Sequence, residues 1–210
     1  RRMNIPVFHD DQHGTAIIIA AGLLNSLEIT QKSINDIRVV FSGIGAAGYT
    51  CAKYLLEFGL KKEQIIMTDI NGVLFEGRDK DQYYCDLAQK TKLRTLNDVI
   101  QNADVFIGLS VGNILTPDML NKMAKHPIVF ALANPYPEIN VQTAKETRND
   151  IIIATGRSDY PNQINNVLAF PYLFKGALQS LSKEINLEMK KAVTTTIAQL
   201  AKTSQSHRFG

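Results

Sequence analysis

The chain has 210 residues, enough to bury a hydrophobic core as one or two domains. Its 45% hydrophobic and 20% charged residues are ordinary for a globular protein, and its formal net charge of +3 is spread along the chain. We therefore expect no nucleic acid and no membrane as partner. The most apolar stretch, residues 15–24, is shorter than the roughly 18 residues of a membrane span. Cys51 and Cys85 lie far apart, which predicts reduced thiols and a cytoplasmic location.

Short apolar segments alternate with helical patterns along the chain. The expected strands are residues 38–42, 64–68, 104–108, 127–132 and 151–154. The expected helices are residues 16–27, 46–58, 81–89, 95–102, 172–181 and 184–202, with a further helix start at Thr116-Pro117-Asp118. Near-continuous Val, Ile and Phe runs are typical of strands buried on both faces. The pattern predicts an α/β fold of Rossmann type, a doubly wound, mostly parallel sheet flanked by helices, which binds ligands beyond the carboxyl ends of its strands.

A glycine loop follows the first expected strand and opens a helix. Its residues are Gly43, Ile44, Gly45, Ala46, Ala47 and Gly48. In this context Gly43 permits a tight turn, Gly45 lets the backbone approach a pyrophosphate, and Gly48 lets the helix lie close to the sheet. The amides at the start of the helix then face the phosphates. A purely structural turn and the loop of an S-adenosylmethionine methyltransferase are alternatives, but Gly48 inside the helix favours a dinucleotide.

Asp69 ends the second expected strand, where an acid commonly binds the ribose hydroxyls of a dinucleotide. Its carboxylate favours NAD, because it would repel the 2′-phosphate of NADP. Arg78 or Lys80, close by in the sequence, could still permit NADP to bind.

Two adjacent carboxylates, Asp10 and Asp11, precede the first expected helix. Like charges side by side are relieved by a divalent cation, and hard oxygen ligands suit Mg²⁺ or Mn²⁺. Two carboxylates make an incomplete metal site, however. From their spacing alone, the favoured interpretation is a solvated turn whose acids cap the following helix. His9 and His13 fall in an expected loop, so their spacing does not indicate a pair of metal ligands.

Two longer segments resemble signatures of the malic enzymes, in the short form found in bacteria and some protists. They are IPVFHDDQHGTAI at residues 5–17 and TGRSDYPNQINNVL at residues 155–168, and Gly108-Leu109-Ser110 and Ala133-Asn134-Pro135 also fit. The resemblance covers nearly the whole chain. It implies the NAD(P)-binding domain of an enzyme that converts (S)-malate to pyruvate and carbon dioxide, reduces NAD or NADP, and uses Mg²⁺ or Mn²⁺.

The resemblance also implies roles for single residues. Asp11 is similar to a metal ligand, and Asp10 to the neighbouring acid that orients the general base. Asn134 and Asn166 resemble the amides that hold the substrate carboxylates and neighbour the nicotinamide. Ser110 and Gly112 would flank the nicotinamide ribose. Taken singly, each asparagine is more often a turn former.

The family's remaining metal ligands, a Glu-Asp pair, and its catalytic lysine and tyrosine lie upstream of these aspartates and are not found here. We therefore expect residues 1–202 to be the NAD(P)-binding domain, with residues 1–30 a leading acidic loop and helix, residues 203–210 a frayed tail, and the N-terminal catalytic domain absent. The family is usually dimeric, which implies a homodimer. Alone, the chain should bind nucleotide without turning over malate. A related dehydrogenase that needs no metal, such as an amino-acid dehydrogenase, and a non-catalytic NAD-sensing module are the alternatives.

Overall fold

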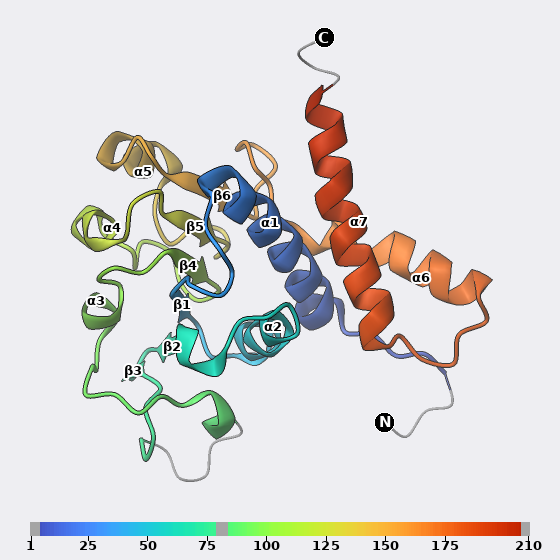
Figure 1. Cartoon of the computed structure of the whole chain (residues 1–210), viewed down its shortest axis with the longest axis horizontal. Coiled ribbons are helices and arrows are strands. Elements are labelled where there is room, and N and C mark those ends of the chain that lie inside the picture. Colours follow the sequence, from blue (N-terminus) through green and yellow to red (C-terminus); the bar gives the residue numbers. More distant parts are fainter. Residues whose placement is uncertain (1–4, 79–83, 207–210) are drawn as a thin grey trace.

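The computed structural model describes residues 5–78 and 84–206, which are built around one six-stranded sheet (Figure 1). The spatial order is β3-β2-β1-β4-β5-β6. All neighbouring strands are parallel except β2 and β3, which are antiparallel. The Rossmann-type, mostly parallel sheet expected from the sequence is thereby confirmed. The strands are β1 (Val39–Ser42), β2 (Ile65–Asp69), β3 (Gly72–Val73), β4 (Val105–Gly108), β5 (Ile128–Ala131) and β6 (Ile152–Thr155).

Successive side chains of the strands enter two separate hydrophobic cores. Phe41 of β1 lies in one core and its neighbour Val40 in the other, as the period of two of a strand requires. The first core is covered by α1 (Thr15–Thr30), α2 (Ala46–Leu56), α6 (Phe170–Gln179) and α7 (Leu187–Ser206). The second is covered by α3 (Leu96–Val99), α4 (Pro117–Lys122) and α5 (Val141–Thr147). This two-sided burial explains the near-continuous apolar strand sequences.

Helix α1 is the central helix of the first core and packs between α2 and α7. Ile17, Ile19 and Leu23 are fully buried there. With the turn before it, the helical segment Asp10–Thr30 is long and apolar enough to cross a membrane, contrary to the expectation from the sequence. More than half of its most apolar window is buried inside the fold, as in the core helix of a globular protein.

Several elements differ from the sequence expectations. A π-helical turn at Asp10–Gly14 replaces the expected loop. Strand β3 was not expected, because its two residues are too few to give a periodic pattern. Helix α5 was not expected either; its start is marked by the capping residue Asn140 and not by regularly spaced apolar residues. Helix α7 continues to Ser206, beyond the expected end at residue 202. The 3₁₀ turns are Lys62–Gln64, Cys85–Leu87 and Asn166–Leu168.

The helix expected at residues 81–89 falls partly outside the described residues, as does Lys80. Within residues 84–89 the chain forms only the turn Cys85–Leu87. The division into residues 1–202 and a tail stays a prediction, and residues 207–210 are not among those described.

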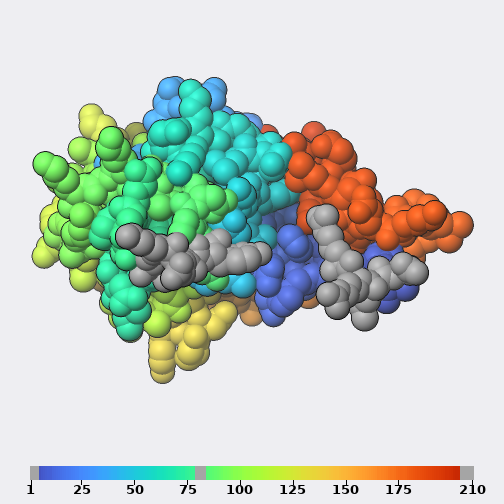
Figure 2. Space-filling model, turned by 90° about the horizontal axis from the view of Figure 1, so that it is seen from below, coloured from blue at the N-terminus to red at the C-terminus, as the bar shows by residue number. Residues whose placement is uncertain are grey.

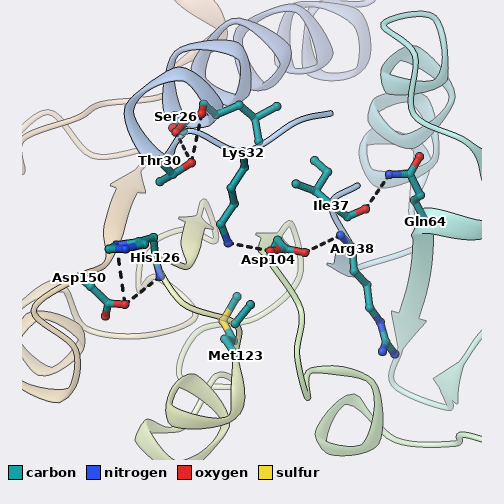
Figure 3. Close-up of polar contacts among 12 residues, drawn as sticks. Ser26, Thr30, Lys32, Ile37, Arg38, Gln64, Asp104, Met123, His126 and Asp150 are labelled. Atoms are coloured by element: carbon teal, nitrogen blue, oxygen red, sulfur yellow. Dashed lines mark hydrogen bonds and ion pairs between the residues drawn. The ribbon is translucent and has the colours of Figure 1, made fainter. Parts of the chain in front are cut away.

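The amino-terminal edge of the sheet is held by polar contacts between the segments that enter the strands (Figure 3). The Lys32 ammonium lies 2.7 Å from one carboxylate oxygen of Asp104, and the other oxygen accepts the backbone N–H of Arg38 at 2.8 Å. The Gln64 amide donates to the carbonyl of Ile37 at 2.7 Å. These contacts fix the starts of β1, β2 and β4 relative to one another.

The last helices stand at one end of the molecule, opposite α3 to α5 (Figure 2). Apolar side chains around α6 are largely exposed there: Val167, Leu168, Phe170, Tyr172, Leu178 and Leu181. Helix α6 therefore buries only part of its apolar surface within the described residues.

Candidate functional site

A crevice is expected where the connections of two neighbouring parallel strands leave in opposite directions. Strands β1 and β4 form such a pair, because β1 is followed by α2 and β2 on one side and β4 by α4 and β5 on the other. The glycine loop follows β1, and residues 109–113 follow β4. Both predicted binding segments thus meet at the switch point of the sheet.

One side of the glycine loop is tightly packed against neighbouring backbone, and another side is open. Gly43 has φ +113°, and a Cβ there would lie 2.5 Å from the carbonyl oxygen of Leu109. A Cβ on Gly48 would lie 2.0 Å from the carbonyl oxygen of Gly43. By contrast, no atom of the described residues, apart from Gly45 itself and its chain neighbours, lies within 4 Å of a Cβ built on Gly45. Helix α2 begins at Ala46, directly after Gly45, and no side chain among the described residues caps its first turn. The first N–H groups of a helix have no partner within the helix, so they are available to a ligand. The loop therefore fits a pyrophosphate.

Asp69 lies at the end of β2 and is held by Arg78. The guanidinium bonds both carboxylate oxygens, with Nη2 to Oδ2 at 2.6 Å and Nη1 to Oδ1 at 3.0 Å. The Asn71 backbone N–H also donates to Oδ1 at 2.8 Å. The Arg78 side chain is 8% exposed and that of Asp69 23%. Because the charge of Asp69 is compensated at close range, its repulsion of a 2′-phosphate is weaker than the sequence suggested.

The loops after β4 and β5 pack closely against each other and against β1. The hydroxyl groups of Ser110 and Ser42 share a hydrogen bond of 2.7 Å. A Cβ on Gly112 would lie 2.6 Å from the carbonyl oxygen of Tyr136, so this position requires a residue without a side chain. Ser110 and Asn134 are exposed, and the peptide bond between Asn134 and Pro135 is cis. Both predicted polar side chains are therefore accessible at the same sheet edge.

The two signature segments meet through Asp10 and Asn166. The Asn166 amide donates to Oδ2 of Asp10 at 2.6 Å, across 156 residues of sequence. Oδ1 of Asp10 is buried and has no hydrogen-bond partner among the described residues. Burial raises the pKa of Asp10, the charge of Asp11 raises it further, and the hydrogen bond from Asn166 opposes the rise. The turn that carries both aspartates packs against α2, the helix of the glycine loop.

The surroundings of His13 disfavour the protonated, charged form of its imidazole. Its Nδ1 lies 3.2 Å from the Lys190 ammonium, and its ring stacks at a tilt on Phe8. Burial, then the charge of Lys190, lowers the pKa of His13 to about 4, so the imidazole is neutral at pH 7. In neutral form Nδ1 accepts a hydrogen bond from the ammonium.

The described residues do not by themselves complete a divalent-cation site. Across residues 5–78 and 84–206, no group of three or more His, Cys, Asp or Glu side chains could hold a metal ion. Asp11 is exposed and Asp10 is engaged with Asn166. Asp11 as a ligand of Mg²⁺ or Mn²⁺ therefore stays a prediction that needs further ligands.

One buried acid at this edge was not predicted. Glu138 is 0% exposed and lies beneath the loops after β4 and β5. In the sequence it follows Tyr136-Pro137, a context typical of a surface turn, and nothing local signals its burial. The sequence feature that relates to this burial is Gly108, where a Cβ would lie 2.2 Å from the Glu138 carboxyl carbon.

A separate cavity of about 520 Å³ lies between α1, β6 and the end of α7. It contains none of the predicted site residues. Its lining combines apolar side chains such as Phe130 with the polar side chains of Asn25 and Gln163.

Comparison with known proteins decides the family. The family described as "Malic enzyme, NAD binding domain" matches residues 12–209. The chain belongs to this malic enzyme family. Membership confirms the resemblance read from the two signature segments, and it favours a malic enzyme domain over an amino-acid dehydrogenase of the same fold.

Malic enzymes of both nucleotide specificities are similar to the chain. It is 53% identical over 208 residues to the NADP-dependent malic enzyme of Haemophilus influenzae, covering 98% of this chain and 28% of the relative. It is 48% identical over 207 residues to the NAD-dependent malic enzyme of Rhizobium meliloti, covering 98% and 27%. The crystal structure of Entamoeba histolytica malic enzyme superposes with a TM-score of 0.92 at 36% identity, covering 97% of this chain and 44% of that one. The chain thus spans between a quarter and a half of the length of these malic enzymes.

Proposed function

We propose that this chain is the nucleotide-binding domain of an enzyme that oxidatively decarboxylates (S)-malate to pyruvate and carbon dioxide while reducing NAD or NADP. The hydrogen bond between Asp10 and Asn166 carries the proposal. It joins the family's two signature segments beside α2, at the sheet edge where the glycine loop is open. A nucleotide and a small dicarboxylate could then be bound side by side.

Different residues of this edge bind different parts of the nucleotide and the substrate. The glycine loop and the first turn of α2 hold the pyrophosphate, and Ser110 and Gly112 flank the nicotinamide ribose. The bound nicotinamide supplies the hydride acceptor for malate. Asn134 and Asn166 hold the substrate carboxylates through neutral amides, and Asn166 retains a second N–H beyond the one given to Asp10. Asp10 orients the base that takes the hydroxyl proton, and that base comes from outside this chain.

The nucleotide choice follows from the pair of Asp69 and Arg78. Asp69 alone favours NAD, but its bidentate partner offsets the charge that would repel a 2′-phosphate. We propose that the domain accepts both NAD and NADP, with the balance set by this ion pair.

The assembly and location of the enzyme complete the proposal. We propose a homodimer, as the family resemblance implies, which light scattering of the purified protein would test. We also propose a cytoplasmic enzyme. Cys51 is buried and Cys85 exposed, and neither forms a disulfide, which fits a reducing compartment.

The test uses this chain and the product of the complete gene. The chain should bind NADH and NADPH without oxidising malate, whereas the complete product should form NAD(P)H, pyruvate and carbon dioxide in equal amounts. Malate oxidation by the chain alone would contradict the proposal. Reduction of NAD(P) by the complete product with an amino acid but not with malate would also contradict it.

A matched pair of variants tests whether the substrate binds at Asn166. Asn166→Asp places a carboxylate against Asp10 and the substrate, so in the complete product the KM for malate should rise at least tenfold while the nucleotide KM stays unchanged. Asn165→Asp is the control, because either side chain can accept the Val167 N–H that Asn165 binds at 3.0 Å. Equal effects of the two variants would argue against a substrate role for Asn166.

A further inference from the structure

Glu138 is a buried carboxylate for which the proposed reaction has no use. It is 0% exposed, and its side chain lies across Gly108, the last residue of β4. Burying a carboxylate is costly unless it is well hydrogen-bonded. Its presence under two binding loops therefore calls for a role.

The carboxylate joins the two loops through their backbones. Oε1 accepts the N–H of Ser110 at 3.2 Å, in the loop after β4. Oε2 accepts the N–H of Ala133 at 3.0 Å, in the loop after β5. Each accepted N–H belongs to, or directly precedes, a polar residue proposed to bind the ligand: Ser110 itself, and Asn134 after Ala133.

Backbone contacts already hold the loops near each other. The Asn113 N–H donates to the carbonyl of Pro137 at 3.0 Å, and the Leu115 N–H to the carbonyl of Glu138 at 2.9 Å. The side chain of Glu138 is therefore not needed to bring the loops together. What it adds is the orientation of two peptide groups at the point where the loops leave the strands.

The orientation extends to the glycine loop. The Ser110 hydroxyl is bonded to that of Ser42, the last residue of β1, and Gly43 lies against the carbonyl of Leu109. A shift of the Ser110 peptide would thus move the surface proposed for the nicotinamide ribose. Asp69, at the end of β2, lies on the other side of β1 and makes none of these contacts.

We infer that Glu138 is a positioning residue that sets the nicotinamide half of the nucleotide site by fixing the loops after β4 and β5. This inference rests on the proposed function. Glu138 itself touches neither nucleotide nor substrate, because it is fully buried and both of its oxygens are used. Burial raises the pKa of Glu138, and the backbone N–H groups of Ala133 and Ser110 oppose that rise.

The test compares a whole nucleotide with its adenine half. Glu138→Gln keeps one acceptor oxygen but turns an NH₂ group toward a backbone N–H, so two donors face each other. The affinity of the chain for NADH should fall about tenfold, the effect of one misdirected buried hydrogen bond. The affinity for ADP, which lacks the nicotinamide half, should change less than about twofold. Calorimetry gives both constants.

Control variants separate positioning from folding. Glu146→Gln alters an exposed acid on α5 and should leave both affinities unchanged. Glu138→Asp keeps the charge with a shorter reach and should lose less NADH affinity than Glu138→Gln; it replaces that variant if Glu138→Gln does not fold. Equal losses for NADH and ADP, or no loss for either, would overturn the inference. Failure of the unaltered chain to bind NADH or ADP would instead overturn the proposed function, and this inference with it.

Discussion

The two edges of the sheet use their polar groups in opposite ways. At the amino-terminal edge the acids are paired. Asp104 binds Lys32 and the Arg38 N–H, and Asp150 binds the His126 N–H (Figure 3). Asp150 also pairs with Arg148. At the carboxyl edge Ser110, Asn134 and Asp11 are exposed, and a Cβ on Gly45 would enter open space. One oxygen of Asp10 is buried with no hydrogen-bond partner within the part of the chain that the structure describes.

We interpret this difference as a division of roles: polar groups at the amino-terminal edge contribute to stability, and those at the carboxyl edge contribute to ligand binding. A polar group that has its partners within the protein has little left to offer a ligand, whereas an unpaired one at a sheet edge is available to it. Glu138 and the pair of Asp69 and Arg78 are exceptions at the carboxyl edge, since their charges are compensated internally; Glu138 supports the loops that carry the exposed residues Ser110 and Asn134. Variants at the amino-terminal edge should therefore alter the free energy of unfolding, and variants at the carboxyl edge should alter affinity.

The largest effect is expected at Gly48, where stability and binding meet. Gly48→Ala forces a Cβ to within 2.0 Å of the Gly43 carbonyl oxygen and should lower the free energy of unfolding by about 3 kcal/mol or more. Gly45→Ala is the matched variant, because its Cβ would have no non-neighbouring atom within 4 Å in residues 5–78 and 84–206. It should unfold at the same urea concentration as the unaltered chain and still lose nucleotide affinity. Normal stability of Gly48→Ala would contradict the packing described for this loop.

The amino-terminal edge gives the next largest effect. Asp104→Ala leaves the Lys32 ammonium and the Arg38 N–H without their acceptor, and should cost about 2 kcal/mol in urea unfolding. Nucleotide affinity of the folded protein should not change. A loss of affinity without a loss of stability would break the division between the edges.

An exposed ion pair provides the control for Asp104. Asp86 lies 2.8 Å from the Lys53 ammonium, but both side chains are nearly half exposed. Asp86→Ala should therefore cost less than about 1 kcal/mol.

The pair of Asp69 and Arg78 tests nucleotide choice at the carboxyl edge. Asp69→Ala releases the Arg78 guanidinium from its carboxylate and should shift the NADPH-to-NADH affinity ratio about tenfold toward NADPH, or about 1.4 kcal/mol. Arg78→Ala leaves Asp69 uncompensated and should shift the ratio the other way. Titration of each variant with both nucleotides measures the ratio. Shifts of the same sign would show that the pair does not set the choice.

A further effect at the amino-terminal edge is the pH dependence of stability contributed by Asp150. Arg148 and the His126 N–H lower the pKa of Asp150 below its ordinary value of 3.8. A depressed folded-state pKa gives stability that is present above the unfolded-state pKa and is lost as the pH falls toward the folded-state pKa. The difference in unfolding free energy between the unaltered chain and Asp150→Asn should therefore shrink below about pH 4. A difference that stays constant from pH 5 to pH 2 would contradict the ion pair.

Strands and the glycine loop could be predicted from the sequence because their signals are local. A run such as that of β4 is apolar at every position, and the loop follows a strand directly. Strand β3 could not be predicted, because its two residues pair with β2 only once Gly72 adopts φ +94°.

The candidate site was only partly predictable. The resemblance supplied Asp10 and Asn166 as separate residues, but their hydrogen bond arises from the packing of segments 156 residues apart. Glu138 could not be predicted from its local sequence, because its burial depends on a tertiary contact with Gly108, the last residue of β4. Contacts made by tertiary packing leave little trace in a single sequence.

The most direct test is a crystal structure of the chain with NADPH. We expect the pyrophosphate against the amides of Gly45 and Ala46, the adenosine ribose beside Asp69, and the nicotinamide ribose beside Ser110. Nucleotide bound instead in the cavity between α1, β6 and α7, or an empty glycine loop at saturating NADPH, would contradict the claim that the carboxyl edge is the binding site.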